Sequence, residues 1–257
     1  MSRILALDVG NTSVAAALFE KTPAREKPVA TFHRPRSAAT ADEIAHWTAL
    51  ARERLPDSVV VGSVHRFGAA LASGLREALG ESVPLKLFEL GDQFPLKSDV
   101  EEPGRVGVDR LAAALGGFTL ARGPALVVSA GTAITVDWVD AGPLFRGGAI
   151  LPGRKLQAKA LHAGTDRLPE IPPWGNPAPL ALPGRNTEEA IRRGLDVGLP
   201  GMVAAVLADL ARAAGARLPV LVSGGDGEWL AARLTGRKRL EPFLVARGLA
   251  LAVEAAA

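Results

Sequence analysis

The chain has 257 residues, of which 48% are hydrophobic, and its formal net charge is +3. This composition supports one large domain or two of ordinary size, and it excludes an intrinsically disordered chain. Cysteine is absent, which excludes disulfides, thiolate metal sites and a cysteine nucleophile.

The 30 basic residues are scattered and nearly balanced by 27 acidic ones, and aromatic residues make up only 5% of the chain. A basic stripe with interleaved aromatics is therefore missing, and we expect no nucleic-acid partner. The N-terminus begins a strand at once instead of a secretory leader. No stretch reaches the ~18 uninterrupted apolar residues of a membrane span. The sequence favours a soluble, cytoplasmic protein with no membrane partner.

The first half of the chain alternates strands and helices, which is typical of layered α/β folds. A capping box at Thr40 predicts that a helix begins there. In chain order, the pattern predicts strands at 3–8, 14–20, 29–34, 58–64 and 84–90, and helices at 40–55, 69–79 and 109–117.

The second half begins the pattern again with an apolar strand, a turn of small residues and a second strand over 125–140. Thr187 is expected to cap a long helix that breaks near Pro200, and the basic segment 235–242 reads as a solvated loop. Further expectations are strands at 143–153 and 219–225, helices at 228–234 and 244–254, and a long Pro-rich loop at 167–187 that contains Trp174.

An internal repeat connects the two halves. When residues 5–10 are laid over residues 126–131, the two small-residue turns coincide and Asp8 is paired with Ser129. Two similar α/β halves usually bind a ligand at their boundary. We place this boundary between residues 122 and 123.

The first turn, from Asp8 to Thr12, carries groups that suit phosphate. Gly10 lets backbone N–H groups approach an anion, and Asn11 and Thr12 offer side-chain donors. Asp8 would repel phosphate, but it can hold Mg²⁺, which bridges phosphates. The alternative is a plain hairpin in which Asp and Asn only form the turn.

Two later turns repeat this chemistry. Gly131 and Thr132 again supply backbone and hydroxyl donors, and the Gly224–Gly225 pair lets a flat ring such as adenine lie against the backbone. The alternatives are an ordinary strand with threonines, and a helix start with Asp226 as its cap. Neither a Walker-type loop nor a dinucleotide-binding glycine motif is present.

The segment 104–117 places Asp109 and Arg110 before an Ala/Leu run of helical character. A carboxylate there can accept a proton from an attacking hydroxyl, and Arg110 can hold a carboxylate or phosphate. Gly107 would let a substrate come close. The alternative is that Asp109 only complements the helix dipole.

These motifs, with 147–153 and Asn186–Thr187 between them, resemble in sequence order the type III pantothenate kinases over nearly the whole chain. That family belongs to the superfamily of actin-like, Hsp70-like and sugar-kinase-like ATPases. The resemblance implies two actin-like (ribonuclease H-like) α/β domains that face each other across a nucleotide cleft. It implies that ATP phosphorylates pantothenate to 4′-phosphopantothenate, the first step of coenzyme A synthesis. It also implies Mg²⁺, a monovalent cation (K⁺ or NH₄⁺) and a homodimer.

The resemblance also assigns residues. Asp109 is the expected catalytic base, and Asp8 is expected to hold Mg²⁺ through the phosphates. ATP is expected to contact Asp8, Val9, Gly10, Asn11, Thr12, Ser13, Val14, Ala15, Gly131, Thr132, Gly224 and Gly225. Pantothenate is expected to contact Val100, Gly107, Val108, Asp109, Arg110 and Thr187.

Two positions depart from the family pattern. Ser129 stands where the family usually has an aspartate that helps to hold the monovalent cation. Val100 lies near the place of a common tyrosine, and this chain has no tyrosine. Two other functions therefore stay open: a non-catalytic nucleotide-binding regulator similar to accessory factors for transcription, and a kinase for another small hydroxyl substrate.

Overall fold

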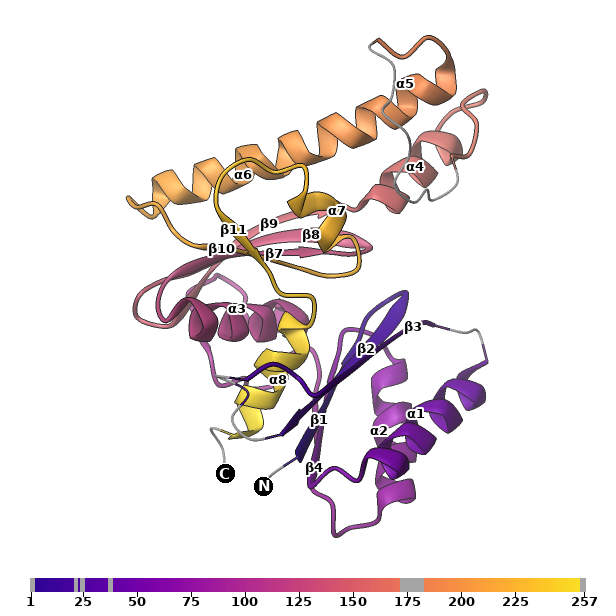
Figure 1. Cartoon of the computed structure of the whole chain (residues 1–257), viewed down its shortest axis with the longest axis vertical. Coiled ribbons are helices and arrows are strands. Elements are labelled where there is room, and N and C mark those ends of the chain that lie inside the picture. Colours follow the sequence, from indigo (N-terminus) through magenta and orange to yellow (C-terminus); the bar gives the residue numbers. More distant parts are fainter. Residues whose placement is uncertain (1–2, 21–22, 24–25, 37–38, 172–182, 255–257) are drawn as a thin grey trace. The chain divides into compact units, whose positions relative to one another are not determined.

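The computed structural model describes residues 3–20, 23, 26–36, 39–171 and 183–254 (Figure 1). The chain divides into two compact units. Unit 1 comprises Met1–Ala125, Trp138–Gly147 and Phe243–Ala257, and unit 2 comprises Leu126–Asp137 and Gly148–Pro242. The C-terminal residues thus join unit 1, so neither unit is one continuous stretch of sequence. A domain boundary between residues 122 and 123 stays a prediction.

Unit 1 is built on a sheet in the order β3-β2-β1-β4-β5. Strand β1 runs antiparallel to β2 and parallel to β4. The strands are β1 (Arg3–Val9), β2 (Ser13–Glu20), β3 (Ala30–Pro35), β4 (Ser58–Ser63) and β5 (Leu85–Phe88).

Both faces of this sheet are covered, which explains why β1 and β4 are nearly continuous apolar runs. Leu5 and Leu7 of β1 belong to a core cluster with Trp47 and with residues of α2. Ile4 and Ala6, which alternate with them, belong to a second cluster with residues of α3 and α8. The helices are α1 (Thr40–Arg54), α2 (Phe67–Leu79), α3 (Val108–Ala121) and α8 (Leu244–Glu254), and a 3₁₀ turn (Pro103–Arg105) precedes α3.

The second sheet has the order β11-β10-β7-β8-β9-β6. Val128 of β7 and Val222 of β10 share a core cluster with residues of α6 and α7, so these helices cover one face of the sheet. The strands are β6 (Lys97–Ser98), β7 (Ala125–Ala130), β8 (Ala133–Val139), β9 (Leu144–Pro152), β10 (Val220–Ser223) and β11 (Lys238–Leu240). The helices of unit 2 are α4 (Arg154–Ala163), α5 (Thr187–Arg193), α6 (Leu199–Ala213) and α7 (Gly227–Ala231).

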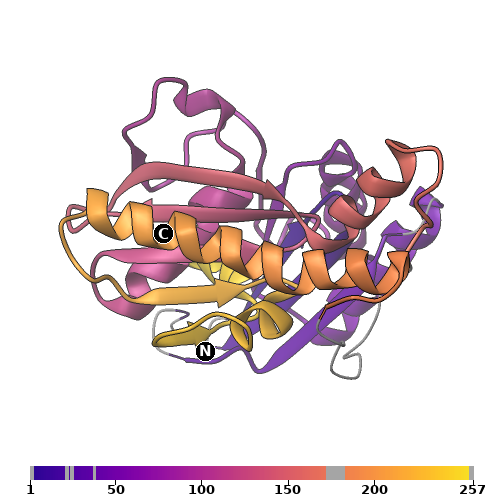
Figure 2. The same ribbon diagram turned by 90° about the horizontal axis from the view of Figure 1, so that it is seen from above.

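One long helical run departs from the sequence prediction. Between α5 and α6 lies a π-helical turn (Gly194–Gly198), and the run continues through Pro200 without a break, as Figure 2 shows. Proline removes a backbone donor, and the wider π turn just before Pro200 is where such a change is accommodated. The predicted break near Pro200 is therefore wrong.

The cap of this run was also predicted wrongly. Asn186, not Thr187, is the N-cap, and its side chain accepts a hydrogen bond from the Glu189 N–H. At the start of α1, the N-cap is Ala39 without any side-chain bond, so the predicted capping box at Thr40 does not form. Helix α1 nevertheless begins at the predicted residue, and α5 begins one residue earlier than predicted.

By length and composition, the 27-residue run Thr187–Ala213 is apolar enough to cross a membrane: its most apolar 18-residue window has a mean hydropathy of 1.5, and 22% of that window is buried. The sequence reading found no uninterrupted apolar stretch of this length, because charged residues are interspersed in it. The run therefore presents an exposed apolar face, and such faces commonly mark interaction surfaces.

Three elements were not predicted: helix α4 and the short strands β6 and β11. Strand β11 lies within the basic segment that was read as a solvated loop, and it pairs in parallel with β10. Much of the Pro-rich segment, residues 172–182 with Trp174, lies outside the described residues. The predicted α/β class and the repeated strand–turn–strand hairpins are confirmed.

Candidate functional site

The turn between β1 and β2 places Asp8 at the carboxyl end of a parallel strand pair, in register with Gly62 of β4. The turn is closed by a hydrogen bond of 3.0 Å from the Gly10 N–H to the Ser13 carbonyl. From outside the turn, the Arg36 guanidinium donates to the Asn11 carbonyl at 3.2 Å. The loop that was predicted to bind phosphate is thus fixed by one main-chain bond and by one bond from the Arg36 side chain.

The predicted ATP contacts in this turn differ in exposure. Asn11 and Thr12 are exposed, and Ser13 and Ala15 are half-buried. Val9 and Val14 are fully buried in the core, so their side chains cannot reach a ligand and only their backbone groups remain for one.

Asp109 lies in the first turn of α3, as predicted, and its Oδ1 accepts a hydrogen bond of 2.9 Å from the Arg110 N–H. A Cβ on Gly107 would overlap this same oxygen, so the missing side chain of Gly107 makes the space for the carboxylate. Val108 is buried in the core, whereas the Arg110 guanidinium lies 5.4 Å from the centre of the Phe145 ring.

The two carboxyl groups of unit 1 influence each other. Burial and, secondly, the negative charge of Asp109 raise the pKa of Asp8 to about 7. Burial also raises the pKa of Asp109, against the opposing effects of the Arg110 N–H bond and the Arg110 charge. A buried carboxylate with a raised pKa is a better proton acceptor, and a pair of carboxylates favours a divalent cation. Asp8 therefore fits a Mg²⁺ site.

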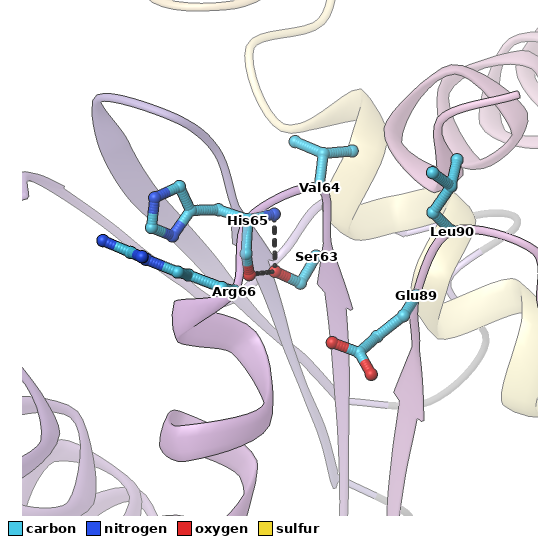
Figure 3. A pocket seen from close by; sticks show the side chains of 6 residues that line it. All are labelled: Ser63, Val64, His65, Arg66, Glu89 and Leu90. Atoms are coloured by element: carbon cyan, nitrogen blue, oxygen red, sulfur yellow. Dashed lines mark hydrogen bonds between the residues drawn. The ribbon is translucent and has the colours of Figure 1, made fainter. Parts of the chain in front are cut away.

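A pocket of about 310 Å³ opens where β4 and β5 end, and it is lined by Ser63, Val64, His65, Arg66, Glu89 and Leu90 (Figure 3). It adjoins both motifs of unit 1. The Val64 N–H donates to the Val9 carbonyl at 3.3 Å, and the Val64 side chain would lie 3.5 Å from a Cβ on Gly107. In Figure 3 the side chains of His65 and Arg66 point away from that of Leu90.

The pocket wall at Ser63 and His65 is rigid. The Ser63 hydroxyl donates to the His65 carbonyl at 2.6 Å, and the His65 Nδ1 accepts the Phe67 N–H at 3.0 Å. Burial and the charges of Arg36 and Arg66 lower the pKa of His65, so its neutral form is favoured. Sequence reasoning missed this pocket. The only signal for it was the Gly–Ser pair at the end of the predicted strand 58–64.

In unit 2, three separate segments meet at the carboxyl end of β7. The Gly153 N–H donates to the Thr132 carbonyl at 2.9 Å, and a Cβ on Gly153 would overlap the Gly131 carbonyl. Gly224 has φ +91° and lies so close to the Ala130 carbonyl that no Cβ would fit. The structure therefore brings the predicted turns at 131–132 and 224–225 together, with Gly153 as an unpredicted third partner.

The expected cation site at Ser129 lacks the charge that such a site uses. The Ser129 hydroxyl and the Thr135 hydroxyl are buried without a hydrogen-bond partner, and both are neutral. The described residues contain no cluster of three or more His, Asp or Glu side chains that could hold a metal ion. Hydroxyl oxygens can ligate K⁺, as carbonyl oxygens do, but these two side chains offer a monovalent cation no negative charge.

The two remaining predicted substrate residues lie apart in the chain. Val100 is half-buried, and its side chain would be 3.4 Å from a Cβ on Gly147, within unit 1. Thr187 is exposed at the start of α5, in unit 2. Their role in substrate binding stays a prediction.

Comparison with known proteins agrees with this geometry. Solved sugar kinases share the α/β fold, among them an inorganic polyphosphate/ATP-glucomannokinase from Arthrobacter with a TM-score of 0.51 at 14% identity over the whole of both chains. Residues 4–209 match the model of a single family, "Type III pantothenate kinase". The chain belongs to the type III pantothenate kinase family.

Individual relatives extend this match. A type III pantothenate kinase from Rhodopirellula baltica is 39% identical over 74% of this chain and 70% of its own length. One from Chlorobaculum parvum is 34% identical over 96% of this chain and 92% of its own. A solved Campylobacter jejuni protein, described as a Baf family transcriptional activator, has a TM-score of 0.61 at 19% identity, with 98% of each chain covered. At that identity the likeness shows the fold alone.

Proposed function

We propose that this protein transfers the γ-phosphoryl group of ATP to the primary hydroxyl of pantothenate, giving ADP and 4′-phosphopantothenate in the first step of coenzyme A synthesis. The observation that carries this proposal is the Asp109 carboxylate, which lies beside the gap left by Gly107 and has a raised pKa. The family membership of the chain supplies the substrate.

Asp109 accepts the proton of the attacking hydroxyl while the new O–P bond forms and the bond between the β,γ-bridging oxygen and the γ-phosphorus breaks. The leaving oxygen departs with its electron pair on ADP. Phosphoryl transfer depends mainly on in-line positioning and charge stabilisation, so the protein does not need to form a covalent intermediate. The raised pKa of Asp109 brings the base closer to the pH at which proton transfer occurs.

Asp8 would hold Mg²⁺, which neutralises charge on the β- and γ-phosphates when it is bound. The backbone N–H groups and side chains of Asn11 and Thr12 donate to phosphate oxygens. In unit 2, Gly131 and Thr132 act in the same way, and the Gly224–Gly225 turn receives the adenosine.

Pantothenate would extend from Asp109 into the pocket beside Val64. This pocket offers apolar surface from Val64 and Leu90 and polar groups from the β4–α2 loop. Arg110, held over the Phe145 ring, would bind the pantothenate carboxylate. Val100 lies near the place of the family's common tyrosine and is smaller, so it would leave room for substrate analogues.

We also propose that the protein is a cytoplasmic homodimer. The exposed apolar side chains include Val197 at 54% and Met202 at 39%, both on the long helical run of unit 2. Ile150 of β9 and Leu156 of α4 are exposed at 61% and 43%. A second copy that covers the long helix would explain its apolar face without a membrane.

The experiment couples ADP release to a spectrophotometric assay, with and without pantothenate, and identifies the product by mass spectrometry. We expect ADP release only with pantothenate, and a loss of about 10²- to 10⁴-fold in kcat for Asp109→Asn. Asp42→Asn is the matched control, because Asp42 is exposed in the first turn of α1 and is remote in sequence from the site.

The outcomes separate the three candidate functions. Nucleotide binding without turnover would indicate the regulator, and turnover with other hydroxyl compounds but not pantothenate would indicate a different kinase. Full activity of Asp109→Asn would refute the assignment of the base.

A further inference from the structure

A buried arginine lies next to the nucleotide-binding segments of unit 2, and no motif accounted for it. Arg154 is the first residue of α4 and is only 7% exposed. Arginine is almost never buried to this degree unless its charge is paired. Its partner therefore indicates what the residue does.

The backbone at Arg154 starts from the phosphate-binding turn. The preceding residue, Gly153, is packed against the Gly131 and Thr132 carbonyls so tightly that it must be glycine, and its N–H donates to the Thr132 carbonyl. Helix α4 therefore begins at the residue that follows Gly153, and Gly153 contacts the turn predicted to hold the ATP phosphates.

The side chain of Arg154 reaches the second nucleotide segment. Its Nη2 lies 3.2 Å from Oδ1 of Asp226, and the two side chains are only 9% and 18% exposed. Asp226 is the N-cap residue of α7, but its carboxylate makes no capping bond. The carboxylate bonds the guanidinium instead, so Asp226 occupies the cap position of the alternative interpretation but forms no side-chain capping bond.

Asp226 is itself fixed to the phosphate-binding strand. Its N–H donates to the Ala130 carbonyl at 3.0 Å, and Gly224, two residues earlier, is packed on that same carbonyl. The Arg154–Asp226 pair thus closes a loop of contacts that joins the end of β7, the start of α4 and the Gly224–Gly225 turn.

An aromatic ring holds the guanidinium in place. The guanidinium carbon of Arg154 lies 4.4 Å from the centre of the Trp229 ring. Arg233 lies 4.6 Å from the same ring, but its ion-pair partner is Asp196, at 4.0 Å, outside the nucleotide segments. The chain thus contains two arginines on one tryptophan, of which only Arg154 is tied to the predicted site.

We propose that Arg154 is a positioning residue for the nucleotide: through Asp226 it holds the Gly224–Gly225 turn against the Gly131–Thr132 turn, so that adenosine and phosphates meet a preformed surface. Preorganisation raises affinity because less conformational freedom is lost on binding. The inference rests on the proposed function only in taking the nucleotide to be ATP or ADP.

The test measures ADP binding by isothermal titration calorimetry in the presence of Mg²⁺ and without pantothenate, together with steady-state kinetics. The variants are Arg154→Met, Arg154→Lys and Asp226→Asn, and Arg233→Met is the matched control on the same ring. Thermal unfolding checks that each variant is folded.

We expect the ADP Kd and the KM for ATP to rise about tenfold or more in Arg154→Met and in Asp226→Asn, with the KM for pantothenate unchanged. The double variant, Arg154→Met with Asp226→Asn, should bind ADP no more weakly than the worse of the two single variants, because the two residues act as one unit. Arg154→Lys should recover part of the affinity, since it keeps the charge without the planar stack. Arg233→Met should bind ADP normally.

Unchanged ADP affinity in folded Arg154→Met would overturn the proposal, as would an equal loss in Arg233→Met. If neither Arg154→Met nor Asp226→Asn folds, the pair is purely structural and the proposal is wrong. Because ADP binding is measured without pantothenate, failure of the kinase assignment leaves this test intact.

Discussion

Asp109 lies close enough to Asp8 for its negative charge, added to the effect of burial, to raise the pKa of the Asp8 carboxyl to about 7. The two residues are 101 positions apart, at the end of β1 and the start of α3 within unit 1. Their proximity brings the proposed base and the proposed metal-binding carboxylate together within unit 1. It also carries an electrostatic cost when no cation is present.

This cost predicts how stability depends on pH. The folded chain holds the Asp8 proton more tightly than the unfolded chain, whose value is 3.8. The stability from this group is therefore complete below about pH 4 and is lost as the pH rises through about 7. At pH 8, Asp8→Asn should be more stable than the natural protein by on the order of 3 kcal/mol, whereas at pH 4 the two should be nearly equal.

Urea unfolding at both pH values measures this difference, and added Mg²⁺ should narrow it at pH 8 by stabilising only the natural protein. A lower stability of Asp8→Asn at pH 8 would show that the two carboxylates do not oppose each other.

The gap at Gly107 gives a second prediction. A methyl group there would overlap Oδ1 of Asp109, so Gly107→Ala should displace the base and lower kcat by about 10²-fold. Gly104→Ala is the matched control, because a Cβ at Gly104 meets no atom within 4 Å. Steady-state assays measure kcat for the two variants. Equal kcat values would contradict the claim that the space at Gly107 positions the Asp109 carboxylate.

The neutral residue at position 129 gives a third prediction. Because the hydroxyls of Ser129 and Thr135 carry no charge, turnover should be the same within about twofold in K⁺, NH₄⁺ and Na⁺ buffers of equal ionic strength. Ser129→Asp should create a buried carboxylate, so its melting temperature should rise with added KCl more than that of the natural protein. A strict K⁺ requirement of the natural protein would contradict this expectation.

The apolar face of the long helix gives a fourth prediction. Met202→Glu places a charge on this face and should convert the proposed homodimer into monomers, as measured by sedimentation velocity. Leu55→Glu is the control, because Leu55 is also apolar and is 70% exposed, but it lies at the end of α1. If Leu55→Glu dissociates the dimer and Met202→Glu does not, the interface lies elsewhere.

Local sequence signals were sufficient for the elements whose pattern is contained within a few residues. The β1–β2 and β7–β8 hairpins follow from apolar runs that flank small-residue turns, and Asp109 follows from its place before a helical run. Local patterns did not predict the elements whose conformation depends on an adjacent strand or turn. Strand β11 exists because β10 offers it a partner, and Pro200 stays within a helix because a π turn precedes it.

The sequence by itself determined the α/β class, the repeated hairpins and the candidate residues, since apolar periodicity and turn chemistry are properties of short segments. Only the tertiary structure decided that Asp8 faces the charge of Asp109, that a pocket opens beside Val64, and that Arg154 bonds Asp226. The two residue pairs are 101 and 72 positions apart in the chain, and the pocket lies between the ends of two strands. They arise from chain packing, which no local pattern encodes.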